Sequence, residues 1–171
     1  MNIYYLGPKT YSELAARKIR RKLKGILQPL PDIDAVMDAT SKEGLAVVAI
    51  HNEIQGSILE NILLIQAYGL KEIKRLKLPI NLCIGQYPGT KERRVYSHSI
   101  PLSCCSDYIK NFQQIETDST ESAARIVKEQ KSGYAIGRKS TLQEHGLEIL
   151  AENISNRGIN NQTEFVVVKK L

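Results

Sequence analysis

The stretch LAVVAI, residues 45–50, is continuously apolar, as expected for a strand buried on both faces of a sheet. Upstream of it, residues 3–6 form a second short apolar run that ends at a Gly-Pro turn. Residues 10–24 then have apolar side chains at helical spacing. Downstream, residues 57–68 predict another helix, which ends at Gly69. Strands that alternate with helices in this way predict an α/β fold with mostly parallel strand pairing.

The alternation continues to the end of the chain. Further strands are predicted at residues 72–78, 80–85, 93–96, 133–137, 147–153 and 165–169. Further helices are predicted at residues 101–111 and 119–131 and directly after residue 137. Thr10 with Glu13, and Asp118 with Glu121, have the spacing of a capping box, in which each side chain satisfies the other's backbone N–H. These two pairs predict where two of the helices begin.

Length and composition restrict the class of protein. The chain has 171 residues, of which 42% are apolar and 25% charged. These values exclude a disordered chain, a collagen-like chain and a disulfide-stapled miniprotein, and the length suits one compact unit or two small lobes. No apolar run approaches the roughly 20 residues of a membrane span. The N-terminus lacks a basic segment leading into an apolar one, so no secretory signal is expected.

The positive charge is concentrated in one short stretch. Residues 17–24 contain six basic side chains, and 18 basic residues balance 18 acidic ones in the remainder of the chain, which gives the formal net charge of +6. The first interpretation of the stretch is a solvated helix face. The alternative is a patch for nucleic acid or an acidic partner. Because the chain has no Trp and only two Phe, few aromatic side chains are present to contact bases, and nucleic-acid binding is the least favoured interpretation.

The cysteines indicate a reducing compartment, such as the cytoplasm. There are three of them, Cys83, Cys104 and Cys105, which is not a disulfide framework. Small apolar packing is the expected role, and no third element supports a catalytic thiol at Cys104 or Cys105. The Cys and His spacings do not match a zinc site, so no metal is expected.

Three turns point to a binding site. Residues 6–12, 96–99 and 117–120 each carry the chain from a strand through hydroxyl-bearing residues into a helix. Ligands of α/β sheets bind beyond the carboxyl ends of the strands, and helix N-termini favour anions. The three turns together predict a cleft for a small, polar molecule that bears carboxylates.

The same stretches resemble the prephenate dehydratase family nearly from end to end. Residues 5–16 resemble the family's opening G-P-x-G-T-[FY]-S, residues 50–57 its I-E-N-S-x-x-G-S, and residues 95–102 its V-x-S-H-P-Q-A-L. Residues 117–124 resemble T-x-S-T-x-x-A-A, and shorter matches occur at residues 135–137 and 146–147. Ile154 and residues 160–165 resemble the closing I-x-D-x-x-x-N-x-T-R-F. The matches lie in the family's order and spacing.

This resemblance implies two α/β lobes of the periplasmic-binding-protein type II kind, each a mostly parallel sheet flanked by helices, with the active site in the cleft between them. Lobe 1 would comprise residues 1–78 and 155–171, and lobe 2 residues 79–154. It also implies a cytoplasmic, cofactor-free lyase that converts prephenate to phenylpyruvate, water and CO2 in phenylalanine biosynthesis. A homodimer is expected by analogy. Because the chain stops at Leu171, a following ACT regulatory domain is expected to be absent.

The resemblance also assigns the site residues. Its catalytic residues correspond to Thr163, Asn52 and His51, and its substrate-binding residues to Thr10, Ser12, Ser97, His98, Thr117, Ser119, Thr120 and Asn161. Thr163 would be the proton donor or organiser. Arg138 is a further candidate from the sequence itself: it follows the predicted strand at residues 133–137, on the side of the three turns, and would supply the cation that Glu164 does not.

Several positions differ from the family pattern: one Gly of the opening motif is missing, Glu53 replaces the Ser of I-E-N-S, and three further differences affect the expected site. Glu164 replaces the Arg of T-R-F, Ile100 replaces the Gln of S-H-P-Q, and His51 replaces the Glu of I-E-N-S. Glu164 would either face the substrate and repel it or point away, because side chains alternate along a strand. Three functions therefore stay open: a prephenate dehydratase, a decarboxylase that acts on prephenate without dehydration, and a non-catalytic protein that binds small carboxylates.

Overall fold

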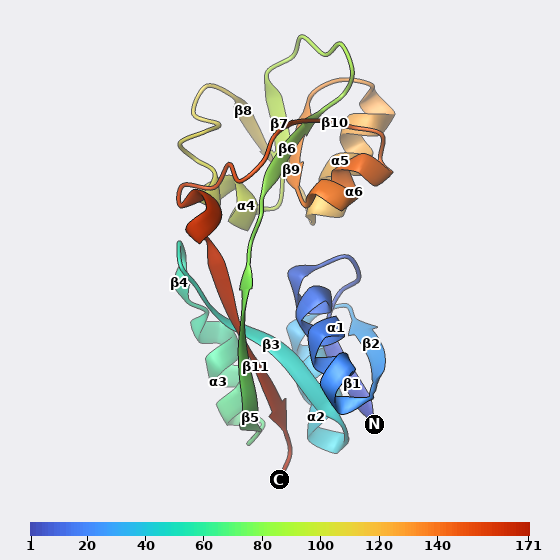
Figure 1. Ribbon diagram of the computed structural model, residues 1–171, viewed down its shortest axis with the longest axis vertical. Helices are drawn as coiled ribbons and strands as arrows, with labels where there is room; N and C mark the ends of the chain where they lie inside the picture. Colours follow the sequence, from blue (N-terminus) through green and yellow to red (C-terminus); the bar gives the residue numbers. More distant parts are fainter. The chain divides into compact units, whose positions relative to one another are not determined.

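The chain divides into two compact units, which are visible in the computed structural model of Figure 1. The structure describes residues 1–171, apart from the side chain of Ile159. Unit 1 comprises Met1–Pro79 and Gln162–Leu171, and unit 2 comprises Ile80–Asn161. Each unit is a sheet flanked by helices, which confirms the α/β class. The lobe boundaries expected after residues 78 and 154 stay a prediction.

Unit 1 contains a six-stranded sheet and three helices. In chain order its elements are β1 (Asn2–Leu6), α1 (Tyr11–Leu23), β2 (Ile26–Leu30), α2 (Ile33–Lys42), β3 (Leu45–Asn52), β4 (Gly56–Ser57), α3 (Leu59–Ala67), β5 (Lys71–Pro79) and β11 (Gln162–Lys169). The strand order is β2-β1-β3-β11-β5, with β4 paired to β3. The strands β2, β1 and β3 are parallel, whereas β11 is antiparallel to both of its neighbours.

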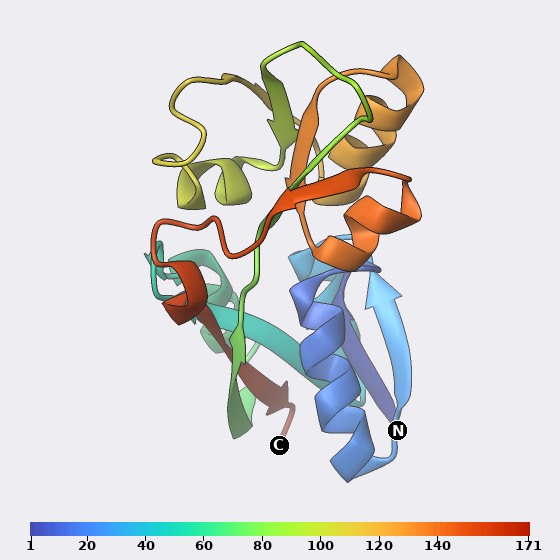
Figure 2. The same cartoon turned by 45° about the horizontal axis from the view of Figure 1, so that its top comes forward.

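The sheet of unit 1 lies between two helical layers. Phe165 and Val167 of β11 pack in one core with α1, whereas Val166 and Val168 pack in a second core with α2 and α3. Figure 2 shows α1, in blue, along one face of this sheet. These two faces are called the α1 face and the α2/α3 face. The strand at residues 45–50 is buried on both of them, as its continuous apolar run predicts.

Unit 2 contains a five-stranded sheet of order β10-β6-β9-β7-β8. Its elements are β6 (Cys83–Gln86), β7 (Arg94–Ser97), α4 (Ser99–Cys104), β8 (Gln113–Glu116), α5 (Thr120–Gln130), β9 (Tyr134–Gly137), α6 (Lys139–Glu144), β10 (Glu148–Ala151) and the 3-10 helix η1 (Gly158–Asn160). The strands β9, β7 and β8 are parallel, so their carboxyl ends share one edge of the sheet. The helices α4, α5 and α6 begin at that edge.

The sheets are mixed rather than mostly parallel. In each unit a parallel set of three strands continues into two strands that each pair antiparallel with the strand before them: β11 and then β5 in unit 1, and β6 and then β10 in unit 2. Turns, and the long connections that pass through the other unit, bring the chain back in the opposite direction. Hydrophobic patterning does not predict the direction in which a strand runs.

Several predicted elements differ in detail. The helix expected at residues 101–111 is the shorter α4, which begins at Ser99 so that Pro101 lies in its first turn, where a missing N–H costs little. The second capping box does not begin at Asp118, because Ser119 is the extended N-cap residue and its Oγ accepts from the Ser122 N–H at 3.0 Å. The sequence patterns do not predict β2, α2, β4, β8 or η1. Among the described residues, no helix is long and apolar enough to span a membrane.

Candidate functional site

The central pair of unit 1 consists of Asn52, at the end of β3, and Thr163, at the start of β11. The two residues are cross-strand partners, and both are buried. The Asn52 side-chain amide donates to Thr163 Oγ1 at 2.9 Å and to the carbonyl of Gln162 at 3.1 Å. Its Oδ1 accepts from the backbone N–H groups of Ile54 and Gln55 at 3.0 and 3.3 Å. The amide is therefore held from both ends, and Thr163 receives a hydrogen bond from a fixed donor.

A β-bulge places Asn52 on the same face of the sheet as Thr163. The register of β3 against β11 shifts, so that Phe165 pairs with Ala49 but Glu164 pairs with His51. The extra residue, Ile50, reverses the alternation of side chains along β3. Asn52 thereby joins Thr163 on the α1 face, where Leu78, the other partner of Thr163, packs into the core of α1.

The same register separates His51 from the pair. His51 is the cross-strand partner of Glu164, and partners in an antiparallel pair share a face. His51 and Glu164 therefore lie on the α2/α3 face, opposite Thr163. The structure brings together two of the three predicted catalytic residues, Asn52 and Thr163, and places the third on the other side of the sheet.

Glu164 forms an ion pair on that face. Its carboxylate lies 3.3 Å from Nη1 of Arg75 on the neighbouring strand β5. Arg75 also contacts Glu72 at 2.7 Å, and this contact lowers the pKa of the Glu72 carboxyl. Of the two orientations left open for Glu164, the structure supports the one in which it points away from Thr163.

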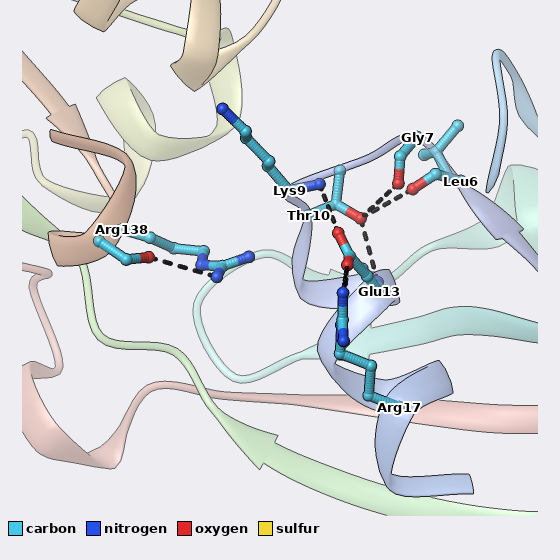
Figure 3. A network of polar contacts seen from close by, with 8 residues as sticks. Leu6, Gly7, Lys9, Thr10, Glu13, Arg17 and Arg138 are labelled. Carbon is cyan, nitrogen blue, oxygen red and sulfur yellow. Dashed lines mark hydrogen bonds and ion pairs between the residues drawn. The ribbon is translucent and has the colours of Figure 1, made fainter. Parts of the chain in front are cut away.

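The turn before α1 is shaped by its own side chains (Figure 3). Thr10 is the N-cap: its Oγ1 accepts from the Glu13 N–H at 3.1 Å and donates to the Leu6 carbonyl at 2.7 Å. Glu13 accepts from the Lys9 N–H at 2.6 Å and pairs with Arg17 at 2.6 Å. Ser12 is buried in the first turn of α1. Because β1 and β3 are adjacent and parallel, this turn and Asn52 lie at the same edge of the sheet.

In unit 2 the predicted hydroxyl residues lie together at the carboxyl edge of three neighbouring strands. Ser97 ends β7 and is fully buried, and its Oγ donates to the Ile136 carbonyl at 2.8 Å. His98 and Ser119 cap α4 and α5, Thr117 Oγ1 donates to the Ser119 carbonyl at 2.9 Å, and Thr120 is the first residue of α5. These hydroxyls position the helix starts, which present backbone N–H groups and positive dipole ends at this edge.

The two remaining predicted binding residues differ in placement. Arg138 follows β9 and is the N-cap of α6, so it lies at the same carboxyl edge, with Nη2 3.4 Å from Ser140 Oγ. Asn161 is 1% exposed and belongs to the segment after η1, where its carbonyl accepts from the Ile80 N–H at 2.8 Å. Within unit 2, Arg138 therefore lies at the same sheet edge as the hydroxyl residues, whereas Asn161 lies in the segment that leads to β11.

The thiols are packing groups rather than nucleophiles. Cys83, Cys104 and Cys105 are all buried in unit 2. Burial raises the pKa of each thiol, in the case of Cys105 to about 12, with a further contribution from the two neighbouring cysteines. A thiol that stays protonated at neutral pH is a poor nucleophile. Among the described residues no group of His, Cys, Asp and Glu side chains is arranged to hold a metal ion.

These raised pKa values predict a loss of stability at alkaline pH. The unfolded chain releases its thiol protons near pH 9, whereas folded Cys105 keeps its proton until about pH 12. The unfolded state therefore binds fewer protons in this range, and the free energy of unfolding falls with pH, by up to about 1.4 kcal/mol per pH unit for one thiol. Urea titrations at pH 8 and pH 10.5 measure the fall. Cys105→Ala should make it less steep, and an unchanged slope would contradict this assignment.

The chain has an α/β fold of the periplasmic-binding-protein type, with hydroxyl and amide groups at the strand ends of each unit. Its structure superimposes on an ABC transporter protein from Parabacteroides distasonis with a TM-score of 0.60, at 13% identity, over 99% of this chain and 66% of that one. The prephenate dehydratase of Arthrobacter aurescens, solved with L-Phe, gives a TM-score of 0.81 at 21% identity, over 100% of this chain and 61% of that one.

The chain belongs to the prephenate dehydratase family, whose pattern it matches over residues 3–171. The prephenate dehydratase of Methanocaldococcus jannaschii is 35% identical over 98% of this chain. The match covers 64% of the length of that relative, so the chain spans less than two-thirds of it. The resemblance inferred from the sequence motifs is thereby confirmed.

Proposed function

We propose that the protein is a prephenate dehydratase, and the hydrogen-bonded pair of Asn52 and Thr163 is the observation that carries this proposal. Prephenate holds a carboxylate and a hydroxyl at opposite ends of a non-aromatic ring. When the hydroxyl departs with a proton, the electrons of the bond to the ring carboxylate complete the aromatic ring. Water and CO2 leave, and phenylpyruvate remains. The step therefore needs a proton donor at the hydroxyl and groups that hold carboxylates.

Thr163 suits the first requirement. In the contacts described for its hydroxyl, Oγ1 is the acceptor of the 2.9 Å bond from Asn52, so its own proton remains to be donated. As Thr163 gives up this proton to the departing hydroxyl, negative charge develops on Oγ1. The Asn52 amide is already oriented to stabilise that charge, and solvent then restores the proton.

Unit 2 suits the second requirement. The starts of α4, α5 and α6 at its carboxyl edge supply backbone N–H donors, and Arg138 at the same edge supplies a cation. A guanidinium is well matched to a carboxylate. We propose that these groups bind the carboxylates of prephenate. In unit 1, Ser12 and the Thr10 turn would contribute at the start of α1.

The placement of Glu164 favours dehydration over the two alternatives. A carboxylate beside the proton donor would repel a dianionic substrate and favour a decarboxylase or a mere binding protein. Glu164 instead pairs with Arg75 on the opposite face of the sheet from Thr163. The proton donor therefore keeps an uncharged neighbour, Asn52, and dehydration is the expected outcome.

Incubation of the purified protein with prephenate tests the proposal. Ultraviolet absorbance should show phenylpyruvate forming well above the acid-catalysed background, and mass spectrometry should show loss of both CO2 and water. A decarboxylated product that retains its hydroxyl would establish the decarboxylase instead. Tight binding of prephenate without turnover would establish a binding protein.

Glu164→Gln provides a separate check on the orientation of this residue. Because the ion pair with Arg75 is partly exposed and lies away from Thr163, we expect kcat/KM for prephenate to change less than about threefold and the free energy of unfolding by less than about 1 kcal/mol. His51→Gln should behave in the same way. A rise in activity of tenfold or more in Glu164→Gln would mean that the carboxylate does face the substrate.

We further propose that the protein forms a homodimer through α3. Leu59 and Leu63 are one helical turn apart, and they are 65% and 61% exposed. In α3, which the structure describes throughout, no residue is buried although most are apolar. Self-association would cover this stripe. Sedimentation analysis should find a dimer, with Leu63→Glu shifting it to a monomer, whereas a monomeric wild type would exclude it.

We also infer a cytoplasmic location. Three buried cysteines, none of them in a disulfide among the described residues, are typical of a reducing compartment. Cell fractionation tests this, and recovery of the protein outside the cytoplasm would contradict it.

A further inference from the structure

The C-terminal half of α1 carries an unusual density of exposed cations. They are Arg17, Lys18, Arg20, Arg21, Lys22 and the C-cap residue Lys24. Within the described part of the chain, Arg17 pairs with Glu13, and the other five take part in no ion pair. The apolar side of the helix, with Ala15, Ala16 and Ile19, is buried against the sheet. The outward side of α1 is thus positively charged and is not compensated within the fold.

A second row of lysines lies on the same face of the sheet. Lys169 of β11 alternates with Phe165 and Val167, which pack against α1, and its cross-strand partner is Lys71 of β5. Lys74 is the partner of Val167 and shares that face. Like charges placed directly opposite each other destabilise a sheet. No ion pair with a carboxylate is described for these three lysines. An anion bound from outside would offset this repulsion.

The acidic residues of unit 1 are found mainly on the opposite side. The helices α2 and α3 and their flanking turns carry Asp32, Asp34, Asp38, Glu43 and Glu60 against one cation, Lys42. The two helical layers of unit 1 therefore have opposite charge. The positive α1 layer is a local arrangement and does not follow from the net charge of the chain.

The position of these cations separates them from the proposed active site. The helix α1 begins at the edge of the sheet that carries Asn52, and it runs back toward the opposite edge. The strand β11 begins beside Asn52 and ends at Lys169, so it runs toward that opposite edge as well. The cationic end of α1 and the lysine pair thus lie at the end of unit 1 remote from Thr163.

We propose that this basic face, formed by Lys18, Arg20, Arg21, Lys22, Lys24, Lys71, Lys74 and Lys169, binds the phosphate backbone of double-stranded nucleic acid without regard to sequence. Residues 17–24 span about 10 Å at 1.5 Å per residue. A duplex carries about six charges over that length. Contact with the backbone needs cations only, and this face provides them in two rows.

The residue types distinguish a duplex from other polyanions. Single-stranded nucleic acid is held by aromatic platforms on which bases stack, and no residue of the basic face is aromatic. Peripheral membrane helices insert apolar side chains, and those of α1 are already buried in the core. Regularly spaced cations on a rigid helix fit a ligand whose charges are themselves regularly spaced.

A salt series with a fluorescently labelled 20-base-pair duplex tests the proposal by anisotropy. With about four phosphate contacts, the logarithm of affinity should fall with a slope of about −3.6 against the logarithm of salt, which is roughly a 100-fold loss between 50 and 200 mM KCl. The triple variant K18E/R21E/K22E should lose at least tenfold in affinity at 50 mM. The matched control K91E/K110E/K128E changes exposed lysines of unit 2 by the same total charge and should bind within threefold of the wild type.

Every other result overturns the proposal. Equal losses in both triple variants would indicate a general charge effect and not a site on α1. Stronger binding of a polyglutamate peptide, or of vesicles with anionic lipid, would assign the face to an acidic protein or to a membrane. Absence of duplex binding at 50 mM KCl would exclude nucleic-acid binding by this face. The substituted residues are exposed, so circular dichroism should show folded variants, and the measurement does not depend on turnover of prephenate.

Discussion

Replacement of Thr163 by valine should lower kcat for prephenate by at least about 100-fold while the protein stays folded. Valine keeps the branched shape of threonine but removes the hydroxyl that donates the proton, and a positioned general acid contributes about 10²–10⁴ in rate. The Asn52 amide loses Thr163 Oγ1 as an acceptor and keeps the Gln162 carbonyl. The free energy of unfolding should therefore fall by only about 1–2 kcal/mol. Steady-state kinetics and a urea titration measure the two quantities.

Thr163→Ser serves as the matched control. Serine restores a hydroxyl within reach of Asn52 and should recover most of the activity, with some loss because its side chain is less restricted at χ1. Substrate affinity should change little in either variant if Thr163 acts on the departing hydroxyl. A valine variant with near-normal kcat would show that another group donates the proton. A serine variant as inactive as the valine variant would show that Thr163 acts through packing alone.

The sequence predicted the general architecture well because burial and capping are local signals. Residues 45–50 are apolar on every position and form a strand covered on both faces. Thr10 has the spacing of an N-cap before an apolar stripe, and α1 begins directly after it. The elements that the sequence does not predict have weaker burial and capping patterns. The strand β2 contains Pro29, which argues against a central strand but is tolerated at the edge, where β2 lies.

The helix α2 could have been found. Asp32 follows a proline and accepts a hydrogen bond from the Ala35 N–H at 2.7 Å, a regular N-cap that precedes the apolar positions Val36 and Met37. The strand β8 has mostly polar residues and lies at the sheet edge, so neither periodicity nor burial marks it. Short polar edge strands are recognised through their partners, which a single sequence does not contain.

Most of the predicted site residues lie at strand ends, but their arrangement relative to one another depends on strand register. Regular alternation from residues 45–50 would place His51 on the α1 face and Asn52 on the other. The bulge at Ile50 reverses this arrangement and pairs Asn52 with Thr163. Bulges arise from how two strands meet, so residues far apart in the chain determine which of two neighbours faces the site.

The hydroxyl residues illustrate a second limit of sequence reasoning. Ser97 and Thr117 were expected to bind substrate, and in the structure their hydroxyls donate to backbone carbonyls of their own unit. A serine at a helix start has the same sequence signature whether it caps the helix or contacts a ligand. We therefore propose that the backbone N–H groups that these side chains position are the main anion-binding groups of unit 2.

The second large effect is expected for Asn52→Asp. The substituted side chain has nearly the same shape, and its Oδ1 can still accept from the N–H groups of Ile54 and Gln55, so the turn after β3 should persist. However, a carboxylate cannot donate to Thr163 Oγ1 or to the Gln162 carbonyl. The hydrogen bond reverses, and Thr163 must donate its proton to the new carboxylate. Because that proton is then directed away from the substrate, kcat should fall by about 100-fold or more.

The pH dependence of Asn52→Asp distinguishes this mechanism from simple damage to the site. Burial of the introduced carboxyl, and a dianionic substrate nearby, both favour its protonated form and so raise its pKa above the usual value. A protonated carboxyl can donate a hydrogen bond to Thr163 as the amide does. The activity of Asn52→Asp relative to the wild type should therefore rise as the pH is lowered from 7 to 5, after subtraction of the acid-catalysed background. Leucine at position 52 cannot donate a hydrogen bond to Thr163 at any pH, so Asn52→Leu should be inactive at both pH values. If the two variants respond to pH alike, the direction of the hydrogen bond between residues 52 and 163 does not control the proton.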